Sequence, residues 1–126
     1  MPTSVSEMVS AANQSVPRID LQRARNLIDD EEALVVDVRD PSEVQQSGKI
    51  RGAVNVSRGM LEFRADPECP AYDPAFDRDR PVLLYCGSGG RSALAGKVLQ
   101  DMGYRTVYNL GAFKDWVEAG LETEPA

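Results

Sequence analysis

The stretch Val82-Leu83-Leu84-Tyr85-Cys86-Gly87-Ser88-Gly89-Gly90-Arg91-Ser92 decides the fold of this chain. Its apolar start, 82–85, predicts a buried strand, and residues 91–102 carry a helical pattern. The segment between them holds a cysteine, three glycines and a serine. A cysteine between a strand and a helix N-terminus has backbone N–H groups and the positive end of the helix dipole directed at its sulfur. Such a setting lowers the pKa of a thiol from about 8.5 into the range of ~3.5–7.5.

The glycine-rich turn also decides between two interpretations of Cys86. A free cysteine at the end of an apolar strand is more often inert core packing than a nucleophile. Glycines, however, let a loop curl its N–H groups inward, and neither they nor Arg91 help to pack a core. We therefore expect Cys86 to be a nucleophile in an anion-binding loop. That loop comprises Gly87, Ser88, Gly89, Gly90 and Arg91.

Strands and helices alternate on both sides of this stretch. The expected strands are residues 33–38, 53–56, 82–85 and 106–110. The expected helices begin after Asp20, at Pro41, near Gly59, at Arg91 and near Phe113. This order predicts an α/β fold, with a mainly parallel central sheet and helices on both faces. Sites in such sheets form beyond the carboxyl ends of the strands, which is where Cys86 falls.

The N-terminal residues are expected to form a separate extension. Ser4-Val5-Ser6-Glu7 matches a capping box and predicts a short helix over residues 5–13, followed by a linker over 14–17. We therefore predict an extension over residues 1–16 and one domain over 17–126. Residues 1–15 lack the basic start and apolar centre of a secretory signal, which favours a cytoplasmic location.

Composition excludes several function classes. The chain contains no histidine, so it has neither a Cys-His relay nor a histidine metal site, and two cysteines alone do not make a convincing zinc site. The net charge of −6 argues against nucleic-acid binding. No apolar run approaches the roughly 20 residues that cross a bilayer. We expect no cofactor, no metal, no nucleic acid and no membrane among its partners.

Four motifs in order resemble the rhodanese family, and the resemblance spans residues 18–125. They are Asp37-Val38-Arg39, the segment 48–56, the loop 86–91 and the segment 111–121. Two positions depart from the family pattern: Lys49 stands where a histidine is usual, and Ala112 replaces a glycine. The resemblance implies a sulfurtransferase with a rhodanese-like fold. In such an enzyme Cys86 takes a sulfane sulfur from a donor, carries it as a persulfide and passes it to a thiophilic acceptor.

The donor implied by the resemblance is thiosulfate or a persulfide, small or carried by a protein, and the acceptor is cyanide or a thiol. Two alternatives remain. A related cysteine phosphatase would need five residues between cysteine and arginine, whereas four lie between Cys86 and Arg91, and no aspartate lies in or next to the loop. A non-catalytic sulfur-carrying or interaction module is the other alternative, which the intact cysteine disfavours.

Three further polar residues are candidates for supporting roles. Asp37 and Arg39 form either an ordinary ion pair at a strand end or a brace for the Cys86 loop. Arg58 closely follows the strand 53–56, so it either attracts an anionic donor at the pocket mouth or is a solvated surface arginine.

The remaining assignments concern the loop and its surroundings. We expect Arg91 to tie down loop carbonyls and to favour the thiolate. Ser88 either hydrogen-bonds the persulfide or fills the turn. Cys69, in a loop flanked by prolines, is expected to be a bystander, and Trp116 is expected to pack in the core.

Overall fold

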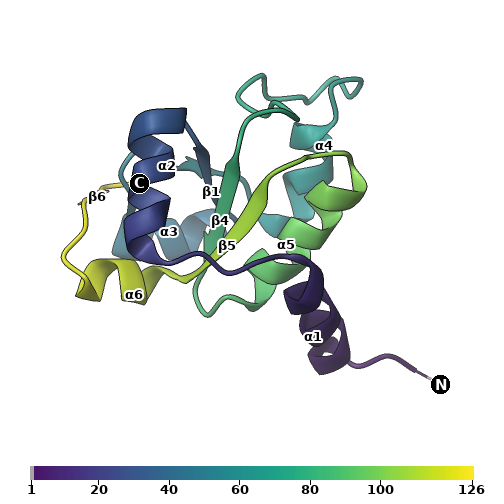
Figure 1. Ribbon diagram of the computed structural model, residues 1–126, viewed down its shortest axis with the longest axis horizontal. Coiled ribbons are helices and arrows are strands. Elements are labelled where there is room, and N and C mark those ends of the chain that lie inside the picture. Colours follow the sequence, from purple (N-terminus) through teal and green to yellow (C-terminus); the bar gives the residue numbers. More distant parts are fainter. Residues whose placement is uncertain (1) are drawn as a thin grey trace.

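A four-stranded parallel sheet forms the centre of the computed structural model, which describes residues 2–126 (Figure 1). Met1, the first residue of the predicted extension, lies outside the described residues. The strand order is β3-β1-β4-β5, and all three neighbouring pairs are parallel. The strands are β1 (Leu34–Asp37), β3 (Val54–Asn55), β4 (Val82–Cys86) and β5 (Val107–Ala112). The predicted parallel α/β sheet is therefore confirmed.

Helices cover both faces of this sheet, also as predicted (Figure 1). Side chains alternate along β1: Leu34 and Val36 pack with α4 (Leu61–Ala65) and α5 (Gly90–Asp101). Val35 packs on the opposite face with α2 (Leu21–Glu31) and α6 (Phe113–Glu118). The continuous apolar strands of the sequence follow from this burial on two sides. The remaining elements are α1 (Val5–Ser15), α3 (Pro41–Ser47), β2 (Lys49–Ile50), η1 (Arg58–Met60) and β6 (Thr123–Glu124).

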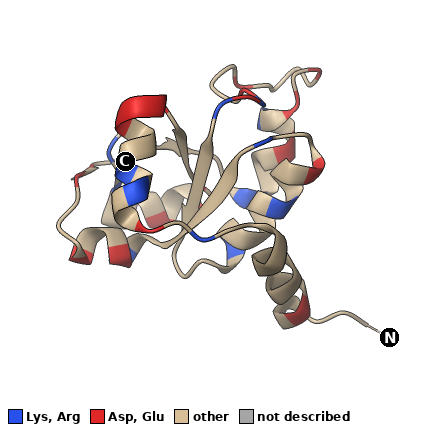
Figure 2. Ribbon diagram, in the orientation of Figure 1, with Lys and Arg blue, Asp and Glu red and all other residues tan. Residues whose placement is uncertain are grey.

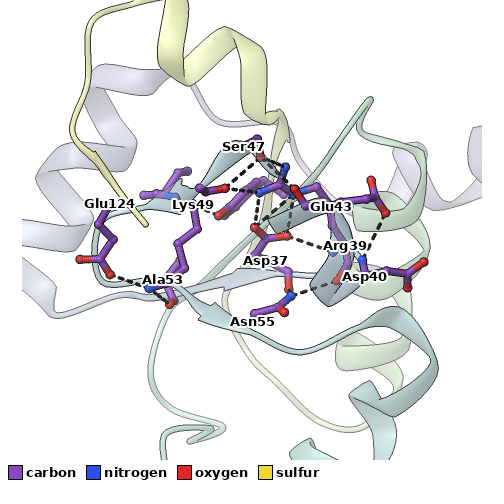
Figure 3. Close-up of polar contacts among 12 residues, drawn as sticks. Asp37, Arg39, Asp40, Glu43, Ser47, Lys49, Ala53, Asn55 and Glu124 are labelled. Atoms are coloured by element: carbon purple, nitrogen blue, oxygen red, sulfur yellow. Dashed lines mark hydrogen bonds and ion pairs between the residues drawn. The ribbon is translucent and has the colours of Figure 1, made fainter. Parts of the chain in front are cut away.

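The predicted strand 53–56 is shorter in the structure, and a second small sheet accompanies it. Strand β3 keeps only Val54 and Asn55, while β2 pairs antiparallel with β6. Lys49 holds this pair together, since its Nζ lies 2.5 Å from Glu124 Oε2 and 2.8 Å from the Ala53 carbonyl oxygen (Figure 3). Two-residue strands carry too little periodicity to be predicted, so sequence analysis missed both β2 and β6.

The N-terminal helix is present and extends two residues beyond its predicted end, to Ser15. It packs against α5, and the capping box of Ser4 and Glu7 is formed. Val16, assigned to a linker, is fully buried against α5, because Gly96 leaves space for its side chain. The segment between α1 and α2 is thus part of the core. Among residues 2–126, every helix is too short or too polar to cross a membrane.

Candidate functional site

The loop between β4 and α5 encloses the sulfur of Cys86 at the carboxyl end of the sheet. Strand β4 ends at Cys86, three residues turn, and α5 begins at Gly90. Gly89 has φ +96°, a conformation that glycine adopts without strain, and its N–H lies 3.0 Å from Cys86 Sγ. A Cβ at Gly89 would also lie 3.4 Å from Gly111 Cα. The positive φ therefore requires a glycine at this turn, and Gly89 packs in contact with Gly111 of β5.

Opposing effects act on the Cys86 thiol. Its side chain is fully buried, and burial alone would raise its pKa. Hydrogen bonds from the Ser92 hydroxyl and from the backbone N–H groups of Ser92, Ser88 and Gly89 outweigh burial, so the pKa of Cys86 lies below its ordinary value. The loop thus stabilises a thiolate without a histidine or a metal ion.

A buried polar network holds the loop in place. Ser92 Oγ lies 3.5 Å from Cys86 Sγ and 2.7 Å from Asn109 Oδ1. The Asn109 amide donates to the Gly89 carbonyl at 3.1 Å, and its Oδ1 accepts from the Gly111 N–H at 2.8 Å. Asn109 therefore fixes the loop to strand β5 at Gly89, the residue whose N–H contacts the sulfur.

Arg91 binds a carboxylate rather than the loop carbonyls that sequence analysis assigned to it. Its guanidinium makes a bidentate contact with Glu43 of α3, at 2.7 and 3.0 Å. This hydrogen-bonded pair lowers the pKa of Glu43 to about 2 and raises the pKa of Arg91. Glu43 lies in the first turn of α3, which follows β1, so the same sheet edge carries both partners. A bidentate carboxylate offers Arg91 stronger hydrogen bonds than neutral carbonyls.

Asp37 and Arg39 form a buried ion pair that supports α3 (Figure 3). Arg39 Nη2 lies 2.7 Å from Asp37 Oδ2 and 2.8 Å from the Gly48 carbonyl, and Nη1 donates to Ser47 Oγ at 2.8 Å. Burial alone would lower the pKa of Arg39, but the hydrogen bonds and charge of Asp37 raise it. The pair does not hydrogen-bond to residues 87–91; it holds the end of the helix that presents Glu43 to Arg91.

The other candidates are spread around the sheet. Arg58 follows β3 and pairs with Glu62 at 3.0 Å, so its charge is compensated. Ser88 is exposed. Cys69 belongs to the segment between α4 and β4, and this segment lies at the end of the sheet opposite the loop between β4 and α5 (Figure 1). Trp116 is buried, as predicted, and donates its indole N–H to the Glu122 carbonyl at 2.8 Å.

Sequence analysis missed four residues of this site. Three of them are Glu43, Ser92 and Asn109, which hold the loop through the contacts given above. Asn109 leaves a signal, since it is an uncharged polar residue within an apolar strand. The fourth is Arg18, which lies against Gly111 and Gly89. Nothing in the sequence around Arg18 indicates this position.

Comparison with known proteins agrees with the geometry of this loop and sheet. The family model described as Rhodanese-like domain matches residues 20–119. A sulfurtransferase of Allochromatium vinosum is 36% identical over 99 residues, covering 78% of this chain and 84% of the relative. The thiosulfate sulfurtransferase GlpE of Actinobacillus succinogenes is 32% identical over 107 residues, covering 83% of this chain and 87% of the relative. A solved structure from Rhodopseudomonas palustris, described as a protein of unknown function and possible tyrosine phosphatase, superimposes with a TM-score of 0.86 at 37% identity, covering 98% and 99% of the two chains.

Proposed function

This chain belongs to the rhodanese-like domain family, and from that premise we propose that it is a sulfurtransferase in which Cys86 carries a sulfane sulfur as a persulfide. One observation carries the proposal: the Cys86 sulfur is held by the N–H of Gly89, 3.0 Å away, within a loop that lowers its pKa. Relatives about one-third identical over most of their length are named sulfurtransferases, which supports the same reaction class. A free catalytic thiol is favoured in a reducing compartment, so we propose that the activity is cytoplasmic.

The reaction divides into two displacements at sulfur. In the first, the Cys86 thiolate attacks the sulfane sulfur of thiosulfate. A Cys86 S–S bond forms, the bond between sulfane and sulfonate sulfur breaks, and sulfite leaves with its electron pair. In the second, cyanide attacks the outer sulfur of the persulfide, the S–S bond breaks, and thiocyanate and the Cys86 thiolate are produced. Neither displacement moves a proton, so a chain without histidine has the groups that the chemistry requires.

The loop stabilises negative charge on sulfur both in the Cys86 thiolate and in the Cys86 persulfide. Backbone N–H groups fixed before the reaction stabilise an anion without reorganisation, as in an oxyanion hole. Asn109 and Ser92 fix the position of Gly89, whose N–H is directed at the sulfur. The loop therefore holds the thiolate before transfer and the charged persulfide after it.

Phosphatase activity is the second candidate, because one solved relative is described as a possible tyrosine phosphatase. Two features of this chain disfavour that activity. Only four residues separate Cys86 from Arg91. Arg91 is also engaged by both carboxylate oxygens of Glu43, which compete with a phosphate for its N–H groups. The two activities are separated by assaying thiosulfate and p-nitrophenyl phosphate with the same preparation.

Steady-state kinetics with thiosulfate and cyanide test the proposal. A persulfide intermediate predicts a ping-pong pattern of parallel double-reciprocal lines. Cys86→Ser is expected to abolish transfer while the far-ultraviolet circular dichroism stays unchanged, and Cys69→Ser, the matched control, is expected to retain it. Transfer by folded Cys86→Ser, or hydrolysis of p-nitrophenyl phosphate with no sulfur transfer, would overturn the proposal.

A further inference from the structure

Arg18 lies in the segment that connects α1 to α2 and crosses the carboxyl ends of the strands (Figure 1). This segment runs alongside β5: the Asn109 N–H donates to the Pro17 carbonyl at 2.9 Å, and Arg18 forms a parallel bridge with Asn109. Backbone pairing therefore fixes Arg18 next to the residue that anchors the Cys86 loop.

The guanidinium of Arg18 lies over two glycines. A Cβ at Gly111 would lie 3.0 Å from Arg18 Cζ, and a Cβ at Gly89 would lie 4.0 Å from its Nη1. Gly89 is also the residue whose N–H contacts Cys86 Sγ. Gly89 therefore contacts the Cys86 sulfur through its N–H and also lies next to the Arg18 guanidinium.

Arg18 also differs from the other arginines of this sheet edge in its charge partners. Arg39, Arg58 and Arg91 are paired with Asp37, Glu62 and Glu43, respectively. Arg18 is exposed, and within residues 2–126 it forms no ion pair. The acidic run of residues 29–32 ends α2 at the opposite end of the sheet (Figure 2). Among residues 2–126, no ion pair therefore neutralises the positive charge of Arg18 beside the Cys86 loop.

We propose that Arg18 is a specificity residue that attracts anionic sulfur donors to Cys86. This inference rests on the proposed function only in taking Cys86 as the nucleophile. The donors that it favours carry a sulfonate or carboxylate group close to the sulfane sulfur, with thiosulfate as the smallest example. When the sulfane sulfur meets Cys86 Sγ, the anionic group of such a donor is drawn toward the guanidinium. Arg18 takes this role in place of Arg58 and Arg91, whose charges are compensated.

Two alkylating reagents test the inference without requiring sulfur transfer. In a Cys69→Ser background, Cys86 is alkylated with anionic iodoacetate and with neutral iodoacetamide, and the ratio of the two rates is measured. Arg18→Gln is expected to lower the iodoacetate-to-iodoacetamide ratio about three- to tenfold, because it removes one partly screened positive charge that attracts only the anionic reagent. The matched control is Arg25→Gln, which removes an exposed charge from α2 at a cavity lined by Trp116 and Leu121, away from the loop.

The outcomes distinguish an effect of the Arg18 charge from a structural effect of Arg18 on the loop. If Arg18 only supported the loop, Arg18→Gln would change both rates by one factor and leave their ratio unchanged, which would overturn the inference. An equal fall in the ratio for Arg25→Gln would overturn it as well. With thiosulfate as donor, the expected result is a higher KM with unchanged kcat, and an unchanged KM contradicts the inference. A protein that shows the alkylation effect but transfers no sulfur would refute the proposed function and leave the anion preference standing.

Discussion

Replacing Ser92 by alanine is expected to raise the pKa of Cys86. The Ser92 hydroxyl has one proton and three acceptors within reach: Cys86 Sγ at 3.5 Å, the Gly89 carbonyl at 3.1 Å and Asn109 Oδ1 at 2.7 Å. The hydroxyl proton turns toward Cys86 Sγ when the sulfur is a charged thiolate, and not when it is a neutral thiol. In the variant, Asn109 Oδ1 still accepts from the Gly111 N–H, and the Gly89 carbonyl still accepts from the Asn109 amide. The substitution therefore leaves no buried group of this network without a partner.

The magnitude follows from the strength of the lost hydrogen bond. Hydrogen bonds to charged groups contribute ~1.5–3 kcal/mol. The length of 3.5 Å and the competition with Asn109 place this bond at the lower end of that range. A loss of about 1.4 kcal/mol corresponds to a rise of about one pKa unit. The backbone N–H groups remain and continue to hold the pKa of the thiol down.

The assay is the rate of iodoacetamide alkylation as a function of pH, measured in a Cys69→Ser background. The midpoint for Ser92→Ala is expected about one unit above that of the parent protein. Ser88→Ala is the matched control, because it removes an exposed hydroxyl from the same loop and keeps the backbone N–H. A midpoint that is unchanged or lower in Ser92→Ala would refute the reasoning, as would an equal rise in Ser88→Ala.

Other substitutions test the surroundings of the site. The ion pair with Arg91 holds the pKa of Glu43 at about 2, below the ordinary 4.5, so its stabilisation is present above about pH 5 and lost as the pH falls toward 2. Glu43→Gln should lower the free energy of unfolding at pH 7 by about 0.5–1 kcal/mol, since the pair is half-exposed, and the difference should vanish at low pH in urea titrations. Gly96→Ala should lower Tm by several degrees in thermal unfolding, because its Cβ would meet Val16 Cγ1 at 2.7 Å and overpacking costs ~1–3 kcal/mol. Cys69→Ser should leave the rate of iodoacetamide labelling at Cys86 unchanged, because Cys69 belongs to the segment that precedes the start of β4 whereas Cys86 ends that strand, and a slower rate would contradict this placement.

The central sheet and the loop could be predicted because their signals are local. The apolar run 82–85, the glycines after Cys86 and the following helix stand together in the sequence, and each specifies its own backbone conformation. Strand 33–38 and the helix over 5–13 were predictable for the same reason. The structure confirms these elements with shifts of one or two residues at their ends.

The partners of the loop could not be predicted because they are distant in sequence. Glu43 and Arg91 are separated by 48 positions, and their pairing depends on how α3 follows β1. An arginine in a glycine-rich loop gives no indication in the sequence that its charge is paired with a distant carboxylate. Arg18 becomes a neighbour of Gly89 only through pairing of its segment with β5. Such contacts depend on tertiary structure, so neither composition nor periodicity contains them.

The most direct test of the account is to locate the transferred sulfur. The protein is incubated with thiosulfate, freed of donor, trapped with an alkylating reagent and analysed by peptide mass spectrometry. The account predicts one additional sulfur atom on the Cys86 peptide, none on the Cys69 peptide, and release of that atom as an equimolar amount of thiocyanate when cyanide is added before trapping. An unmodified Cys86 in a preparation that turns over, or the additional sulfur on Cys69, would contradict it.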